Sequence, residues 1–151
     1  MPQSLVHIPI QIVFSTRHRQ PWLADREQRV ELYRYMHGIC RNLGCPAIKI
    51  NGPSDHVHVL CSLRRQTAIA DLVRDLKSCS SKWSHERFDD LRDFHWQKGY
   101  GAFASSPSAV PEVIRYIENQ EAHHRKISFK EEFRSMCNEA GLVIDERYVW
   151  E

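Results

Sequence analysis

The sequence predicts an α+β fold with the element order β-α-β-β-α-β, followed by further helices. Three observations support this order: alternating apolar residues at the start, two stretches with helical apolar spacing, and a turn-rich tetrapeptide between two short apolar runs. The chain has 151 residues, 42% hydrophobic and 26% charged, which is enough to bury a core. No repeat or linker-like stretch divides it, so we expect one domain over residues 1–151.

The first strand is predicted from apolar side chains at every second position, which share one face of a sheet. These residues are Val6, Ile8, Ile10, Ile12 and Phe14. A polar, basic loop follows at residues 16–21. Asp25 can cap the first helix, which we expect to run to about Leu43, because apolar residues recur with helical spacing and Gly44 suits a helix end.

The next two strands are predicted as a hairpin. Pro46 opens the first of them, with Ile48 and Ile50 on one side. Residues 51–54 (Asn-Gly-Pro-Ser) are strong turn formers, so the following strand, residues 56–63, should pair back on it. A second amphipathic helix then has apolar residues at positions 69, 72, 73 and 76, and we expect it to continue toward residue 83.

The C-terminal half supplies the fourth strand and the extra helices. Residues 95–103 contain Gly99 and Gly101, and glycines within a strand often mark a bulge or a close backbone approach. A third helix is expected over residues 110–126, and residues 129–151 form a shorter helix, to about residue 140, with an extended tail. This order corresponds to a ferredoxin-like arrangement, in which two helices cover one face of a four-stranded antiparallel sheet and the other face is open.

Composition limits the classes of function. The net charge is only +2, so a nucleic acid would have to bind a local cluster of positive charge. The five cysteines form no Cys-x-x-Cys pair, which predicts reduced thiols rather than disulfides or a zinc knuckle. No apolar run approaches the roughly 20 residues of a membrane span, and the N-terminus lacks the features of a signal peptide. We therefore expect a cytoplasmic protein without a membrane partner.

Two histidines in the predicted third strand suggest a metal site. His56 and His58 alternate with Val57 and Val59, so both imidazoles should stand on the open face of the sheet, where they could share one metal ion. The alternative is a pair of half-exposed histidines without a ligand, because His-x-His is an unspecific pattern. A catalytic zinc would need a third histidine or a carboxylate. Further histidines that could be recruited are His85, His95, His123 and His124.

The third predicted helix carries a phenol and a carboxamide on one face. Tyr116 and Gln120 are four residues apart, at the margin of an apolar stripe, and His123 continues the same line. A tyrosine in this position usually only packs against the core. Beside a metal, however, Gln120 could offer a neutral oxygen ligand and Tyr116 a nucleophile.

Three segments carry a resemblance to a known family: His56-Val57-His58, the segment Trp96-Gln97-Lys98-Gly99-Tyr100-Gly101, and Tyr116-Ile117-Glu118-Asn119-Gln120. Together they resemble the single-tyrosine HUH transposases of the insertion sequence 200/605 type, over nearly the whole chain. The combination of His-x-His with Tyr-x-x-x-Gln is specific, although His-x-His alone is not. The resemblance implies that Tyr116 is the nucleophile and that His56, His58 and Gln120 bind a divalent metal, Mg²⁺ or Mn²⁺.

The resemblance also implies a reaction and partners. The protein would cleave and rejoin single-stranded DNA at element ends through a 5′-phosphotyrosine, recognise imperfect hairpins and form a homodimer, with Tyr116 acting in its own or in the partner's site. Because the covalent link conserves the energy of the broken bond, no nucleotide cofactor is needed, and the sequence has no P-loop. Asp55 either orients a metal-bound histidine or is a turn residue.

DNA contacts would come from basic and aromatic side chains. The basic candidates near the predicted active surface are Arg17, Arg19, Arg64, Arg65, Lys77 and Lys82, and the aromatic ones Trp83, Trp96 and Tyr100. Three alternatives stay open: a replication-initiator or relaxase-type nickase with the same chemistry, a domesticated relative that processes chromosomal repeats, and a non-catalytic nucleic-acid-binding module. The module should carry aromatics in its central strands, where this sequence has His56 and His58.

Overall fold

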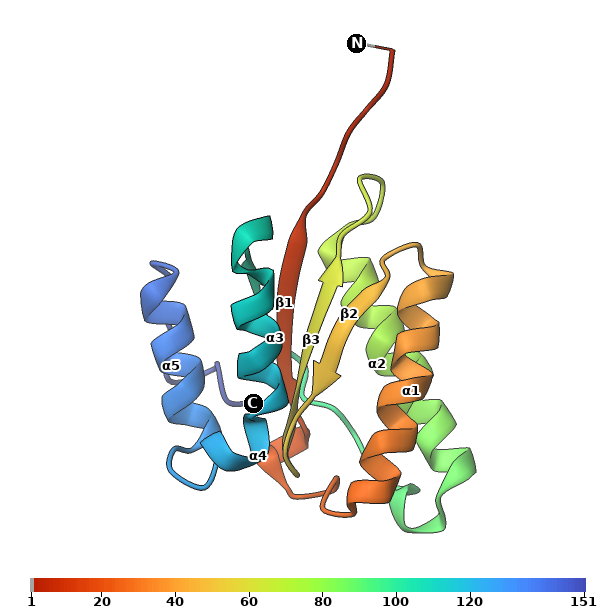
Figure 1. Cartoon of the computed structure of the whole chain (residues 1–151). Coiled ribbons are helices and arrows are strands. Elements are labelled where there is room, and N and C mark those ends of the chain that lie inside the picture. The colour runs from red at the N-terminus through yellow and green to blue at the C-terminus, as the bar shows by residue number, and fades with distance from the viewer. Residues whose placement is uncertain (1) are drawn as a thin grey trace.

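The computed structural model describes residues 2–151 and contains a four-stranded antiparallel sheet with the order β2-β3-β1-β4. Strands β1, β3 and β2 lie side by side in Figure 1. The strands are β1 (Pro9–Ser15), β2 (Ala47–Asn51), β3 (His56–Ser62) and β4 (Gly101–Ala104). With β1 and β3 in the centre, this is the ferredoxin-like order that the sequence predicts.

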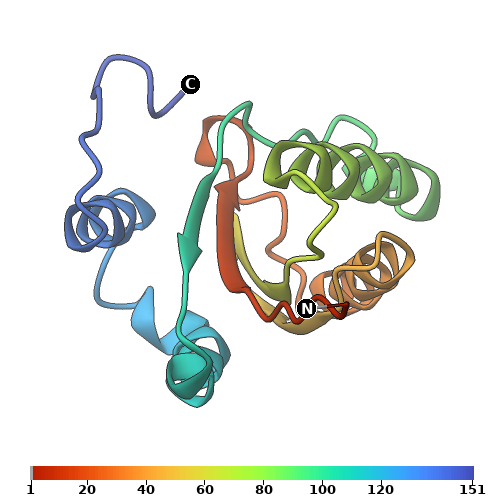
Figure 2. The ribbon, with the colours of Figure 1, turned by 90° about the horizontal axis from the view of Figure 1, so that it is seen from above.

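Helices lie on both faces of the sheet. They are α1 (Arg26–Asn42), α2 (Ile69–Arg87), α3 (Val110–Glu118), α4 (Gln120–His123) and α5 (Phe129–Glu139), with short 3₁₀ turns at Arg17–Arg19, Asp89–Leu91 and Pro107–Ala109. Viewed from above, α1 and α2 cover one face, and α3 and α5 lie on the other (Figure 2). As predicted, the Asp25 carboxylate caps α1, where it accepts from two backbone N–H groups, and Gly44 adopts a positive φ just after the helix.

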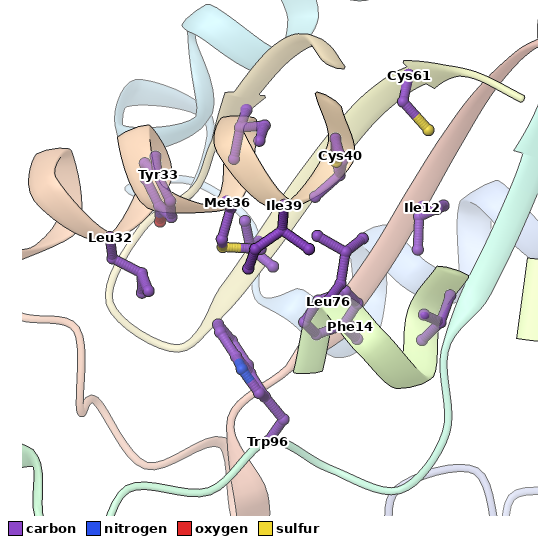
Figure 3. Close-up of a cluster of buried hydrophobic side chains, with 14 of the residues drawn as sticks. Ile12, Phe14, Leu32, Tyr33, Met36, Ile39, Cys40, Cys61, Leu76 and Trp96 are labelled. Carbon is purple, nitrogen blue, oxygen red and sulfur yellow. The ribbon is translucent and has the colours of Figure 1, made fainter. Parts of the chain in front are cut away.

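The main core lies between the sheet and the helices α1 and α2 (Figure 3). Ile10, Ile12 and Phe14 point into it from β1, as the alternation predicts. Val6 and Ile8 do not continue the strand: they precede it and are 46% and 41% exposed. The ladder between β1 and β3 ends at the pair of Pro9 with Ser62, and beyond it the Leu63 N–H donates to the Ile8 carbonyl oxygen at 2.9 Å.

The second face of the sheet, predicted to be open, is covered. Phe129, Phe133 and Cys137 follow one another at intervals of four along α5 and bury Val13 of β1. Trp150 of the C-terminal tail packs against both phenylalanine rings. The expectation of an open face was wrong because this apolar stripe of α5 needs a surface to cover, and β1 supplies it.

Four segments differ locally from the predictions. A register shift between Ala47 and Lys49 interrupts β2, so that Ile50 enters the core and Ile48 does not. The fourth strand begins only at Gly101, although Trp96 forms an isolated bridge with Thr16. The helix predicted over residues 110–126 breaks at Asn119 into α3 and α4, and the tail forms turns over residues 145–151 rather than an extended segment.

The cysteines and the helices agree with two further predictions from composition. All five cysteines are free thiols, as expected, and four of them are buried. Over residues 2–151, no helix is both long and apolar enough to cross a membrane.

Gly101 allows β4 and α5 to pack closely. A methyl group on this glycine would lie 2.6 Å from the Phe133 ring and 2.9 Å from the Phe103 ring. Gly101→Ala is therefore expected to lower the free energy of unfolding by about 1–3 kcal/mol through overpacking. In Gly99→Ala, a matched control whose new methyl meets nothing closer than 4.0 Å, the change should stay within about 0.5 kcal/mol. Urea denaturation of both variants measures the difference, and equal stabilities would contradict the close packing of α5 on β4.

Candidate active site

The two strand histidines lie side by side beneath α3 and α5. His56 and His58 point to the same face of β3, with ring centroids 5.2 Å apart, as the alternation predicts. Both are fully buried, so the expectation that they stand on an open face, half-exposed or free, was wrong. The His56 ring packs against Phe129 of α5, and the His58 ring meets the Tyr116 ring at 5.7 Å.

A third imidazole, from the segment after α4, joins them. The ring of His124 lies 4.3 Å from that of His56. All three imidazoles are held in the same way, through Nδ1: His56 by Asp55 Oδ1 at 2.7 Å, His58 by Gln11 Oε1 at 2.7 Å, and His124 by the carbonyl oxygen of Ile127 at 2.9 Å. In a neutral ring, an oxygen acceptor at Nδ1 favours the tautomer with its proton there and leaves the Nε2 lone pair directed into the site, whereas a protonated ring also donates from Nε2.

The three Nε2 atoms converge on one carboxylate, that of Glu132 in α5. Glu132 Oε1 lies 3.0 Å from His124, 3.1 Å from His58 and 3.2 Å from His56. The four ligand atoms lie within 4.8 Å of one another, and Glu132 is 2% exposed. These distances are those of a cluster that could hold a metal ion.

Sequence reasoning missed Glu132 as a site residue and named His124 only as one of several extra histidines. A local pattern could have revealed Glu132, because its carboxylate lies on the buried face of α5, between Phe129 and Phe133. A charge on an apolar helix face is rarely buried without a partner.

Tyr116 and Gln120 reach the same carboxylate through its other oxygen. The Tyr116 hydroxyl donates to Glu132 Oε2, and Gln120 Nε2 donates to that atom at 3.1 Å. The Gln120 carboxamide oxygen lies 3.3 Å from His56 Nε2, at the convergence of the imidazoles. His123 Nε2 lies 3.3 Å from Glu132 Oε2. One chain therefore brings together all the residues predicted for the metal and the nucleophile.

Burial and hydrogen bonding set the protonation of these groups. Burial lowers the pKa of His58 to about 4, whereas the hydrogen bonds of His56 to Asp55 and Glu132 outweigh burial and raise its pKa. Burial also opposes the charge on Glu132, but hydrogen bonds from the three imidazoles hold its pKa well below the usual range. Burial, followed by the contact with Glu132, raises the pKa of Tyr116 far above its ordinary value. The structure thus pairs an ionised carboxylate with a neutral phenol.

A cleft of about 500 Å³ opens beside the phenol, between α3 and α5. Tyr116, His123 and Glu132 line it. A separate hollow of about 560 Å³ lies where Arg17 and Lys98 approach Trp150 of the tail. The cleft adjoins Tyr116, and the hollow is lined by Arg17, Lys98 and Arg147 together with Glu151.

The basic residues predicted for DNA binding do not form one patch. Arg17 is exposed after β1, close to Asp55, whereas Arg64 and Arg65 follow β3 and lie at the opposite end of the sheet. Lys82 is exposed on α2. The Lys77 ammonium is engaged within the chain, because it donates to the carbonyl oxygens of residues 97, 98 and 99 at 2.7, 3.2 and 2.7 Å.

The aromatic candidates and Arg19 also have structural contacts. Trp96 is buried and donates to the Ser80 hydroxyl, so its ring belongs to the core. Trp83 stacks on Tyr35 at 4.8 Å, while Tyr100 is 40% exposed. Arg19 donates to the carbonyl oxygen of Trp150 and contacts its ring, which ties the tail to the 3₁₀ turn after β1.

Comparison with known proteins identifies the family. The family model described as "Transposase IS200 like" matches residues 4–120. The chain belongs to the IS200-like transposases. The matched region includes the histidine pair, Tyr116 and Gln120, but ends before His124 and Glu132. The sequence resemblance to single-tyrosine HUH transposases is thereby confirmed.

Solved structures show the same fold in other transposases. A protein from Deinococcus radiodurans R1 assigned as a transposase aligns with a TM-score of 0.64 and 24% identity, over 78% of this chain and 93% of its own. A REP-associated tyrosine transposase bound to a REP hairpin aligns with a TM-score of 0.60 and 15% identity, over 83% and 73%. No protein of curated function matches the sequence.

Proposed function

We propose that this transposase cleaves and rejoins single-stranded DNA, with Tyr116 as the nucleophile and a divalent metal held by the buried histidines. The observation that supports this best is the contact of the Tyr116 phenol with the carboxylate on which His56 and His58 converge. Family membership favours a transposase over a replication-initiator nickase or a non-catalytic binding module. The buried histidines, in place of exposed aromatics on the central strands, also speak against such a module.

The residues around the cluster fit a metal ion. Each imidazole is fixed at Nδ1 by an oxygen acceptor, which is the outer arrangement of most metal-bound histidines. His56 and His58 would bind the ion, with Gln120 supplying a neutral oxygen. When bound, a divalent ion polarises the scissile phosphate and offsets the charge that develops on its oxygens.

The remaining chemistry is assigned to Tyr116. Its oxygen forms a bond to phosphorus and its proton passes to solvent, while the bond from phosphorus to the 3′ oxygen breaks and that oxygen takes up a proton. The products are a 5′-phosphotyrosine and a free 3′-OH. Attack of a 3′-OH on that linkage rejoins DNA and regenerates the phenol, so no nucleotide cofactor is consumed. Because a single chain brings Tyr116 to the cluster, we propose that it acts in its own active site even if the protein is a homodimer.

The substrate is proposed to be a single strand with an imperfect hairpin. The structural neighbour bound to a REP hairpin supports this choice, since it shares the fold. The protein could be the transposase of a mobile element or a domesticated enzyme that processes chromosomal repeats, and both roles agree with a hairpin substrate. A cytoplasmic location, as predicted from the sequence, suits either one.

End-labelled oligonucleotides test the function. The protein is incubated with hairpin-bearing single strands labelled at the 5′ or the 3′ end, with Mg²⁺ or Mn²⁺ or with a chelator, and resolved on a denaturing gel. The proposal expects metal-dependent transfer of the 3′ label, but not the 5′ label, to the protein. Cleavage without a covalent adduct, or with the 5′ label attached, would contradict the proposed reaction.

Asp55 is expected to position His56 for the metal. Its carboxylate accepts from His56 Nδ1 at 2.7 Å, so Asp55→Ala frees the ring to rotate. Metal affinity should fall about 10–100-fold, and Asp55→Asn, which keeps an acceptor oxygen, should recover part of it. Isothermal titration with Mn²⁺ measures both variants, and Asp89→Ala, at a 95% exposed side chain, is the control. Unchanged affinity in Asp55→Ala would leave Asp55 as a turn residue only.

A further inference from the structure

The Glu132 carboxylate divides its two oxygens between the two parts of the site. Oε1 faces the Nε2 atoms of His56, His58 and His124 at 3.0–3.2 Å. Oε2 accepts from the Tyr116 hydroxyl and from the Gln120 carboxamide. Glu132 therefore contacts both the metal cluster and the hydroxyl of the proposed nucleophile.

The contacts around Oε1 call for either protons on the Nε2 atoms or a metal ion. The Nδ1 atoms of all three imidazoles face oxygen acceptors, which favour a proton at Nδ1, so neutral rings would direct three Nε2 lone pairs at one carboxylate oxygen. Lone pairs facing an anion repel it, and this is resolved by extra protons or by a metal ion between the groups. A buried divalent ion would bind all four ligand atoms, the three Nε2 atoms and one Glu132 oxygen, at once.

The element that carries Glu132 is held firmly in place. Phe129 and Phe133 pack α5 against β1. The C-terminal tail contacts α5 through the Arg134–Glu146 ion pair and through the Trp150 ring, which lies against Arg134. Ser128 caps its first turn. A donor on an anchored helix is preorganised for coordination.

We propose that Glu132, together with His124, completes the metal centre, and that Glu132 also holds the Tyr116 phenol beside the ion. This inference rests on the proposed function and adds to it two ligands from beyond the matched family region. Three imidazoles and a carboxylate form a nitrogen-rich set, which suits Mn²⁺, Co²⁺ or Zn²⁺ better than Mg²⁺, an ion that prefers oxygen ligands and retained water.

Metal titrations of the full chain, followed by calorimetry, test the ligand role. Wild-type protein should bind Mn²⁺ and Zn²⁺ more tightly than Mg²⁺ by at least about ten-fold. Glu132→Gln should weaken Mn²⁺ binding by at least about ten-fold, while Glu131→Gln, at the exposed neighbour on α5, should not change it. Glu132→Asp keeps the charge but shortens its reach, and is expected to bind with intermediate affinity. If Glu132→Gln does not fold, Glu132→Asp replaces it in the titrations.

Fluorine NMR tests the link to the nucleophile without DNA. In protein labelled with 3-fluorotyrosine, Tyr116→Phe identifies the Tyr116 resonance. Zn²⁺ should shift this resonance in the wild type and in Glu131→Gln, but much less in Glu132→Gln. The same titration in His124→Gln should retain the shift at higher Zn²⁺ concentrations, because that variant weakens the ion's binding and leaves the Glu132–Tyr116 contact in place.

Two outcomes would overturn the inference. If Glu132→Gln binds Mn²⁺ as tightly as the wild type or more tightly, the carboxylate blocks the cation's position rather than serving as a ligand. If Mg²⁺ binds as tightly as Mn²⁺, the nitrogen-rich set is wrong. The proposed function fails separately: wild-type protein that binds Mn²⁺ through Glu132 but forms no adduct with hairpin DNA refutes cleavage and leaves the metal centre intact.

Discussion

Replacing Tyr116 with phenylalanine is expected to abolish the covalent DNA adduct, with a loss of cleavage rate of about 10³-fold or more. The change removes one oxygen that lies next to Glu132 and keeps the ring that packs on His58. The other four tyrosines lie elsewhere, at Tyr33, Tyr35, Tyr100 and Tyr148. Among the described residues, it is the Tyr116 hydroxyl that contacts Glu132.

The measurement is adduct formation with labelled hairpin DNA over a time course. Tyr148→Phe makes the same chemical change at a 61% exposed position and should behave as the wild type. Mn²⁺ affinity should be retained in Tyr116→Phe, which separates loss of the nucleophile from loss of the metal. Adduct formation at the wild-type rate in Tyr116→Phe would rule out Tyr116 as the attacking group.

The second large effect is expected from His58→Ala. This variant removes an imidazole that is fully buried and 3.1 Å from Glu132 Oε1, so both the metal and the carboxylate lose a partner. We expect metal binding and adduct formation to fall together, by about 100-fold or more. The free energy of unfolding should fall by about 3–5 kcal/mol, because the Glu132 charge stays buried with fewer partners.

Calorimetry with Mn²⁺, the adduct assay and urea denaturation measure these three quantities on one preparation. His37→Ala is the matched control, since His37 lies on α1, away from the cluster. If His58→Ala binds Mn²⁺ normally and yet forms no adduct, the ion lies elsewhere and His58 has another role.

The sequence predicts the parts of the site that follow from local periodicity. Alternation in β3 places His56 and His58 on one face, and four-residue spacing places Tyr116 near Gln120, even though the helix between them breaks at Asn119. It does not predict what covers that face. His58 and Glu132 are 74 residues apart, and only the docking of α5 on β1 brings them into contact.

The same limit applies to the predicted DNA-binding residues. A sequence shows that Lys77 is basic and Trp96 aromatic, but it does not show their partners. In the structure, three carbonyl oxygens surround the Lys77 ammonium, and Ser80 fixes the Trp96 indole within the core. Arg17 is exposed, and the preceding residue contacts Asp55 beside the cluster. Its role in binding DNA stays a prediction.

In the proposed mechanism, the imidazoles and the phenol of a single chain form one active site. Mixing Tyr116→Phe with His58→Ala tests it directly, because each variant keeps the half that the other lacks. We expect the equimolar mixture to form no more adduct than the two variants form separately. Restored adduct formation, with His58→Ala as the labelled chain, would show that the tyrosine of one subunit serves the histidines of another.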